Sequence, residues 1–167
     1  LYSWRVVPAE GAIPESTMVE VLDAIATLAE QWRDGAPGGR PVDVVTLSLG
    51  YYHESPGDEA FDAVIAAPLR RLAACGVVVV CAAGNDATTR PRMPAALAAR
   101  PWGPDAAPLV SVGAMNPNGT TDALFSNAGP WVTAFRPGAA VLSTMPSNDT
   151  SRQPATATLH DGRPRAA

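Results

Sequence analysis

An asparagine and the small residues before it are the positions best suited to chemistry in this chain. Residues 78–85 read Val-Val-Val-Cys-Ala-Ala-Gly-Asn, a β-branched run that ends in small residues. This pattern predicts a buried parallel strand with the side-chain amide of Asn85 at its carboxyl end. Ligands of open α/β sheets bind outside the carboxyl ends of strands, so Asn85 is a candidate donor in an active site. A turn asparagine is the alternative, because Asn and Gly are both common in loops.

Hydrophobic periodicity predicts the strands and helices that position this residue. Apolar or β-branched runs predict strands over residues 1–7, 42–49, 77–82, 109–114, 131–135 and 141–144. Helical spacing predicts one helix that ends before Gly35 and another over 58–74, with Pro68 as a kink or a break. The order of strands and helices predicts a parallel sheet. Residues 90–108, rich in Pro and Ala, predict a long surface loop.

Each predicted helix has one apolar face. Thr17 and Glu20 have the spacing of a capping box at the start of the first helix. The residues expected to face the core are Val19, Leu22, Ile25, Ala26, Ala29 and Trp32 in the first helix, and Phe61, Val64, Ile65, Leu69 and Leu72 in the second.

Composition excludes several classes of protein. The 167 residues suffice for one domain with a core, and a composition of 47% hydrophobic and 17% charged residues argues against a disordered chain. The net charge of −4 and scattered basic residues give no reason to expect nucleic acid as a partner. No apolar run approaches the roughly 18 residues of a membrane span. Cys75 and Cys81 are expected to be small buried hydrophobes, neither a disulfide framework nor a metal site.

An ordered series of short motifs carries a family resemblance. The motifs are Ser48-Leu49-Gly50, Ala82-Ala83-Gly84-Asn85, Met93-Pro94-Ala95, Ser111-Val112-Gly113-Ala114, Phe125-Ser126-Asn127, Pro137-Gly138 and Leu142-Ser143-Thr144. The series resembles the central segment of the catalytic domain of a subtilisin-like serine protease, of the subtilase family. The resemblance covers residues 1–145 and leaves 146–167 as a polar loop or flexible tail. It implies an incomplete α/β fold, a three-layer α/β/α sandwich with a mainly parallel sheet.

The resemblance also implies roles for individual residues. Asn85 matches the residue that donates to the oxyanion of the tetrahedral intermediate, where a neutral amide favours the charge that develops in the transition state. The residues that match substrate-binding positions are Ser48, Leu49, Gly50, Ala82, Ala83 and Gly84. Small residues there would let an extended polypeptide substrate pair with the strand ends. Otherwise Gly50 and Gly84 merely end their strands. Pro94 matches a proline that is often cis.

Catalytic motifs of the family are missing from this sequence. Its Asp-Thr-Gly, His-Gly-Thr and Gly-Thr-Ser motifs, which carry the Asp, His and Ser of the triad, do not occur here. The two histidines, His53 and His160, are expected to be solvated loop residues, because no motif supplies them with a nucleophile and an orienting acid. Asp43, Asp58 and Asp62 are expected to be charges on strand edges or helix faces.

Departures from the family pattern also affect the expected specificity. Met93 stands where an aromatic residue is frequent, Arg136 replaces a usual Ala, and Tyr51-Tyr52 follow Gly50 where a smaller residue is usual. These three differences leave the cleavage specificity open.

Three interpretations remain at this level. The chain is a segment of an active endopeptidase that is inactive alone, a non-catalytic subtilase-like module that binds peptides or proteins, or a different α/β binding domain. On the first interpretation its partners are a polypeptide substrate and the flanking segments of its own domain, and exposed apolar surface would promote self-association. No cofactor is implied, and calcium in the parent protein is left open. Many relatives are exported, which favours secretion, but the residues themselves leave the compartment open.

Overall fold

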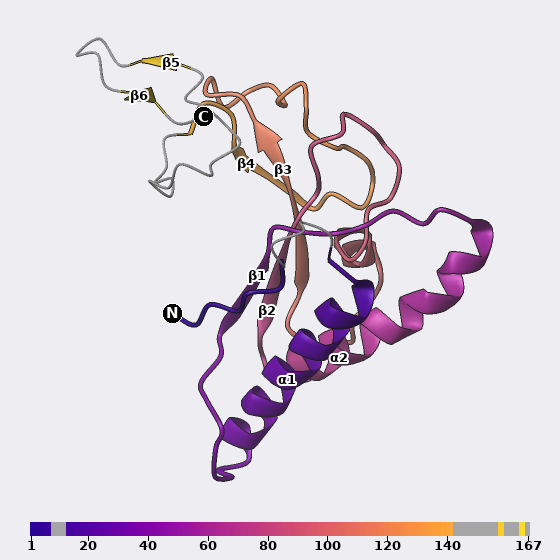
Figure 1. Ribbon diagram of the computed structural model, residues 1–167, viewed down its shortest axis with the longest axis vertical. Coiled ribbons are helices and arrows are strands. Elements are labelled where there is room, and N and C mark those ends of the chain that lie inside the picture. The colour runs from indigo at the N-terminus through magenta and orange to yellow at the C-terminus, as the bar shows by residue number, and fades with distance from the viewer. Residues whose placement is uncertain (8–12, 142–156, 159–163, 166–167) are drawn as a thin grey trace.

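A four-stranded parallel sheet organises the chain (Figure 1). The computed structural model describes residues 1–7, 13–141, 157–158 and 164–165. The sheet has the order β1-β2-β3-β4, with β1 at Val44–Leu47, β2 at Val78–Ala82, β3 at Leu109–Met115 and β4 at Ala134–Pro137. Two further short strands, β5 (Ala157–Thr158) and β6 (Pro164–Arg165), pair antiparallel. The α/β class and the parallel sheet are thereby confirmed.

Two helices pack together and cover one face of the sheet. The first, α1, spans Glu15–Arg33, and the second, α2, spans Asp62–Ala74. Alternate strand residues such as Val79, Cys81 and Leu109 are buried in one core with both helices. On the opposite face Val44 is 56% exposed. The second helical layer of the expected sandwich is therefore not among the described residues, none of whose helices is long and apolar enough to cross a membrane.

The predicted start of α1 is wrong. The helix begins at Glu15, two residues before Thr17, with Pro14 as N-cap and no side-chain cap hydrogen bond. A proline fixed near φ −61° with extended ψ can precede a helix without donating a cap bond, and the Glu15 carboxylate complements the helix dipole. The capping box lies elsewhere, at Ser55 and Asp58, where a 3-10 turn, η1 (Pro56–Phe61), leads into α2.

The core faces of the helices are mostly as predicted. Leu22, Ile25, Ala26 and Ala29 of α1 and Ile65, Leu69 and Leu72 of α2 are buried, and α2 runs through the buried Pro68 without ending there. Three predicted core residues are exposed instead: Trp32 by 58%, Phe61 by 61% and Val64 by 52%. Trp32 lies in the last turn of α1, Phe61 is the N-cap of α2, and Val64 lies in the first turn of α2.

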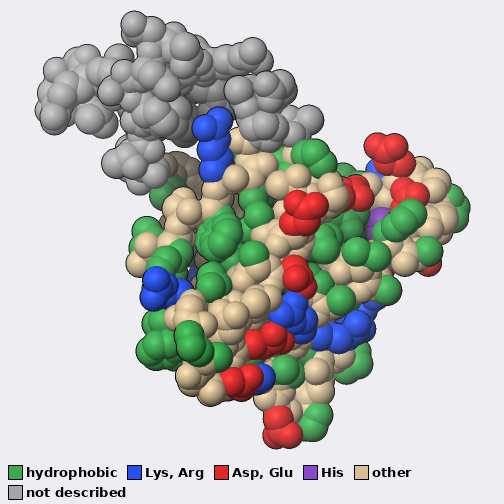
Figure 2. Space-filling model, turned by 60° about the horizontal axis from the view of Figure 1, so that its bottom comes forward, with side chains coloured by type: hydrophobic (Ala, Val, Ile, Leu, Met, Phe, Trp, Pro, Cys, Tyr) green, Lys and Arg blue, Asp and Glu red, His purple; other side chains and the backbone are tan. Residues whose placement is uncertain are grey.

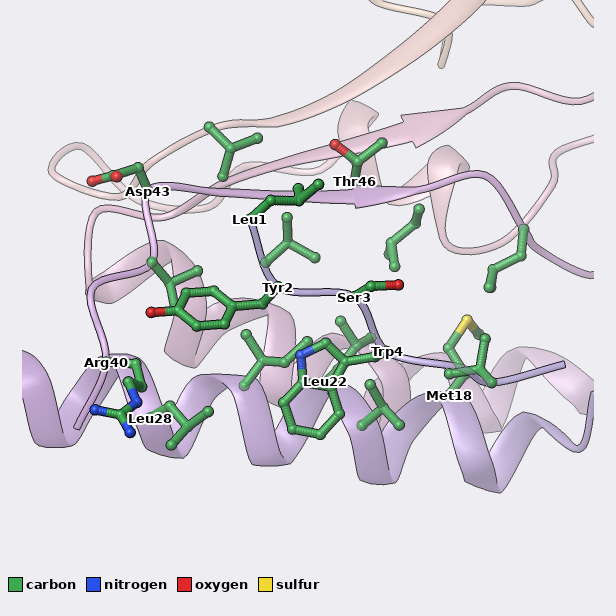
Figure 3. Close-up of a pocket in the computed structure, with 18 of the residues that line it drawn as sticks. Leu1, Tyr2, Ser3, Trp4, Met18, Leu22, Leu28, Arg40, Asp43 and Thr46 are labelled. Carbon is green, nitrogen blue, oxygen red and sulfur yellow. The ribbon is translucent and has the colours of Figure 1, made fainter. Parts of the chain in front are cut away.

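The predicted strand over residues 1–7 does not form in the structure. Its backbone makes no hydrogen bond with the sheet, and a cavity of about 690 Å³ separates it from β1 and α1. Figure 3 shows the segment running beside β1, with Trp4 over α1. Alternating apolar residues favour a strand only where a neighbouring strand is close enough to pair, and here the side chains of Tyr2 and Trp4 face the cavity instead.

The remaining predictions differ in detail. Residues 90–108 contain a 3-10 turn, η2 (Ala95–Ala99), and Leu97 is fully buried, because apolar side chains of this segment pack against β3. The last predicted strand, over 141–144, and most of the tail over 146–167 lie outside the described residues.

Arg71 connects the two helices through charged hydrogen bonds. From α2 its Nε donates to Glu30 Oε1 of α1 at 2.9 Å, and Nη2 donates to Thr27 Oγ1 at 2.9 Å. Its Nη1 also pairs with Asp23. Hydrogen bonding from Arg71 lowers the pKa of Glu30.

On the face shown in Figure 2, acidic and basic side chains are intermixed.

We predict that Arg71→Gln destabilises the complete protein, whereas Arg70→Gln on the exposed face of α2 does not. Loss of a half-exposed ionic network should cost about 1 kcal/mol in the free energy of unfolding, measured by denaturant titration. Because the Glu30 pKa is lowered, the stabilisation is fully present above the unfolded-state pKa of about 4.3 and is lost as the pH falls below it. Equal destabilisation by both variants at neutral pH would contradict this assignment.

Candidate functional site

The carboxyl ends of β1 and β2 lie side by side. In the parallel register Leu47 pairs with Cys81, so Ser48–Gly50 and Ala82–Gly84 lie at the same edge of the sheet, the one formed by the carboxyl ends of its strands. Both glycines also approach one side chain. A Cβ on Gly50 would lie 3.3 Å from Arg92 Cζ, and a Cβ on Gly84 would lie 2.8 Å from Arg92 Cδ. The two predicted substrate-binding stretches are therefore neighbours.

Asn85 lies at this edge with an exposed side chain. Its amide makes no hydrogen bond to any described residue. The backbone around it is unusual, with Gly84 at φ +116° and Ala87 at φ +52°, both in the region that side chains rarely adopt. The loop therefore holds the Asn85 amide at the surface, next to position 84, where only glycine fits.

Backbone groups at the two strand ends are also open to a ligand. Among the described residues, the N–H groups of Leu49, Gly50, Gly84 and Asn85 donate to no acceptor. Ala83 differs, since its N–H donates to Val112 and it is buried. Unpaired main-chain donors beyond the ends of two neighbouring strands suit pairing with an extended peptide.

Asn127 holds the loop that carries Asn85. It is fully buried, and its Oδ1 accepts from the Asp86 N–H at 2.9 Å and from the Thr88 N–H at 3.4 Å. Its Nδ2 donates to Ala83 O at 2.9 Å, while its own N–H donates to Gly84 O at 3.0 Å. One side chain thus connects residues on both sides of Asn85.

Tyr52 completes this network from the other strand end. Its hydroxyl accepts from Asn127 Nδ2 and donates to Asp86 Oδ2, each at 2.6 Å. The Arg90 guanidinium lies 5.0 Å from the centre of its ring, a cation–π contact. Partial burial, followed by the hydrogen bond to Asp86, raises the pKa of Tyr52, so the phenol stays protonated and can donate.

An isolated antiparallel bridge between Tyr51 and Met93 joins the segment after β1 to the segment that carries Pro94. Tyr51 N–H donates to Met93 O at 2.9 Å, and Met93 N–H donates to Tyr51 O at 2.8 Å. Burial raises the pKa of Tyr51 to about 12. The Met93–Pro94 peptide bond is cis, as the family resemblance implied.

His53 and Asp62 are not the solvated groups that the sequence suggested. Asp62 is buried and accepts from His53 Nε2 at 2.9 Å and from Arg100. The carboxylate bridges two loops because a buried charge requires partners. No hydroxyl or thiol in the described part of the chain bonds to the His53 ring, so this pair is a structural link.

The other sequence candidates lie apart from this edge. Asp43 is exposed, Asp58 bonds to Ser55 in the turn before α2, and His160 falls outside the described residues. No three His, Cys, Asp or Glu side chains within the described ranges are grouped as metal ligands would be. The expectations about cofactors and calcium stay predictions.

Sequence reasoning missed the role of three side chains. The motif that contains Asn127 indicates no role for it, Tyr52 differs from the family pattern without a predicted contact, and no sequence pattern marks Arg92. A buried polar residue has no periodic signature, and all three act through contacts 34 to 75 positions away.

We predict that Asn127→Ala loosens the loop that carries Asn85. Without Oδ1, the Asp86 and Thr88 amides lose their acceptor and should exchange hydrogen faster, as measured by mass spectrometry on residues 84–89 of the complete protein. Asn116→Ala, which removes a turn asparagine bonded to Thr121, is the control and should leave this segment unchanged. Unaltered exchange in Asn127→Ala would show that the side chain does not hold the loop.

Solved structures share this fold. A cold-adapted subtilisin-like serine proteinase has 23% identity and a TM-score of 0.59, over 83% of this chain and 41% of its own. A lanthipeptide protease has 17% identity and a TM-score of 0.59, over 80% and 36%. The psychrophilic subtilisin-like protease Apa1 from the Antarctic psychrotroph Pseudoalteromonas sp. AS-11 has 26% identity and a TM-score of 0.55, over 84% and 26%.

The chain therefore spans less than half the length of each of these three proteases. A family-level comparison covers more of it, since the sequence matches the model of the subtilase family over residues 1–161. On this match, the chain belongs to the subtilase family.

Proposed function

We propose that this chain is the central part of the catalytic domain of a serine endopeptidase. The observation that carries the proposal is the exposed, unbonded amide of Asn85 beside two glycine-bearing strand ends. Family membership supports peptide-bond cleavage, and the free main-chain donors at the strand ends suit an extended polypeptide substrate.

In this proposal Asn85 acts on the transition state. When a serine from outside this chain attacks the scissile carbonyl, negative charge moves to the carbonyl oxygen, and Asn85 Nδ2 donates a hydrogen bond to it. A donor that is fixed before the reaction stabilises that charge without reorganising. The network around Asn127 and Tyr52 serves this requirement by holding the backbone on both sides of Asn85.

The strand ends would position the substrate. Leu49–Gly50 and Gly84 offer main-chain donors, and the absence of a side chain at both glycines lets a peptide backbone approach. The Asp, His and Ser of the catalytic triad would come from flanking parts of the parent protein, so we expect this chain alone to be inactive. Secretion of the parent remains a prediction from the family resemblance.

We predict that Asn85→Ala in the complete protein lowers kcat on a chromogenic peptide about 100- to 1000-fold, the usual loss on removing one oxyanion donor. KM should change little, because the donor acts on charge that is absent from the ground state. The matched control is Thr89→Ala, which removes an exposed side chain of the same loop.

Two results would separate the alternatives. Equal kinetics for Asn85→Ala and wild type would remove Asn85 from the mechanism. A complete protein that binds peptides but hydrolyses none would favour the non-catalytic binding module instead.

A further inference from the structure

Arg92 occupies the space between the two strand ends. Its Nη2 donates to the Gly50 carbonyl at 3.2 Å. Its aliphatic part passes Gly84, where an added Cβ would come within 2.8 Å of Cδ. The side chain thus runs from one strand end to the other, with its aliphatic part beside Gly84, the residue that precedes Asn85, and its guanidinium beside Gly50.

The Arg92 guanidinium has unused hydrogen-bonding capacity. It is half-buried, yet no carboxylate lies within 4.0 Å of it in the described part of the chain. A guanidinium has five N–H donors, and only one hydrogen bond from Arg92 reaches a described residue. Ser111 Oγ is the one buried side-chain N or O atom without a partner among the described residues, so the unpaired nitrogens of Arg92 are not completely buried.

Some arginines of the fold are neutralised by carboxylates of the same chain. Arg71 pairs with Asp23 and Glu30, and Arg100 pairs with Asp62. Partial burial of a cation without a counter-ion is unfavourable, and a carboxylate that accepts two parallel N–H bonds is the group that best offsets it. The geometry at Arg92 therefore suits a ligand carboxylate.

Neighbouring charges do not cancel this preference. Asp86 is the one acid in the network, and the hydroxyl of Tyr52 already donates to it. Arg90, which lies over the ring of Tyr52 and donates to the His53 carbonyl, adds a second positive charge to this network. The two positive charges of Arg92 and Arg90 therefore exceed the single negative charge of Asp86 in this network.

We propose that Arg92 makes this site specific for an acidic side chain, Asp or Glu, on the substrate residue that carries the scissile carbonyl. The proposal rests on the proposed function. If Asn85 binds the carbonyl oxygen, the residue bearing that oxygen lies beside Gly84, and its side chain enters the space where Arg92 lies. The guanidinium then binds the substrate carboxylate.

The test uses the complete protein and three peptides that differ only in the residue carrying the scissile carbonyl. This residue is Glu, Gln or Lys. For the wild type, kcat/KM should be about 10- to 100-fold higher for Glu than for Gln, the size of effect expected for a charge-assisted hydrogen bond, and lowest for Lys. Arg92→Gln should bring the Glu-to-Gln ratio close to one while retaining hydrolysis of the Gln peptide. Arg92→Lys, which keeps the charge but not the planar fork, should retain part of the preference.

Arg70→Gln is the matched control, since it removes an exposed arginine of α2 outside the space between the glycines, and it should retain the Glu preference. The same peptides with a reduced, uncleavable bond supply dissociation constants by fluorescence anisotropy. Hydrolysis without a Glu preference, or a preference that survives Arg92→Gln, would overturn the role of Arg92 and leave the proposed function standing. Peptide binding with an Arg92-dependent Glu preference but no hydrolysis would overturn the proposed function alone. A complete protein that neither hydrolyses these peptides nor binds them with an Arg92-dependent Glu preference would overturn the role of Arg92 and the proposed function.

Discussion

The parallel pairing of β1 with β2 is the constraint on which the site depends. Its register brings Gly50 and Gly84 to one edge, and both lie so close to other atoms that a Cβ would clash. On Gly50 the added atom would lie 2.3 Å from the Met93 carbonyl oxygen, and on Gly84 it would lie 2.4 Å from Asn127 Nδ2. The glycines thus permit the close approach of the segments that carry Met93, Arg92 and Asn127.

The buried amide of Asn127 makes the hydrogen bonds that hold the loop, so the exposed amide of Asn85 is not needed for them. The two Nδ2 donors of Asn127 reach Ala83 and Tyr52, and its Oδ1 receives two backbone N–H groups, so its hydrogen-bonding capacity is filled. The loop therefore keeps its shape without any contribution from the Asn85 side chain. Because a satisfied buried polar network rigidifies its surroundings, the neighbouring amide can remain unbonded and still be held in one place.

Elements could be predicted from the sequence where burial alone determines them. The apolar runs of β1, β2 and β3 and the inner faces of both helices have simple periods, and they were located within a few residues. Prediction failed where the outcome depends on a distant partner: residues 1–7 alternate like a strand but do not pair, and Asp62 is a buried link between loops. The position of Asn85 beyond the end of β2 could be predicted because a strand pattern precedes it directly, whereas the position of Arg92 between two glycines exists only in the folded chain.

The fold uses arginine in two physically different ways, and the difference bears on recognition. Arg71 and Arg100 neutralise carboxylates of the same chain, so their charges contribute to cohesion between helices and loops. Arg92 is held by a neutral carbonyl, which fixes the position of the guanidinium but leaves its charge uncompensated. A cation that is positioned by a neutral group remains available to a ligand, whereas one positioned by a carboxylate does not. The anchor to Gly50 is thus what would allow Arg92 to discriminate between substrates.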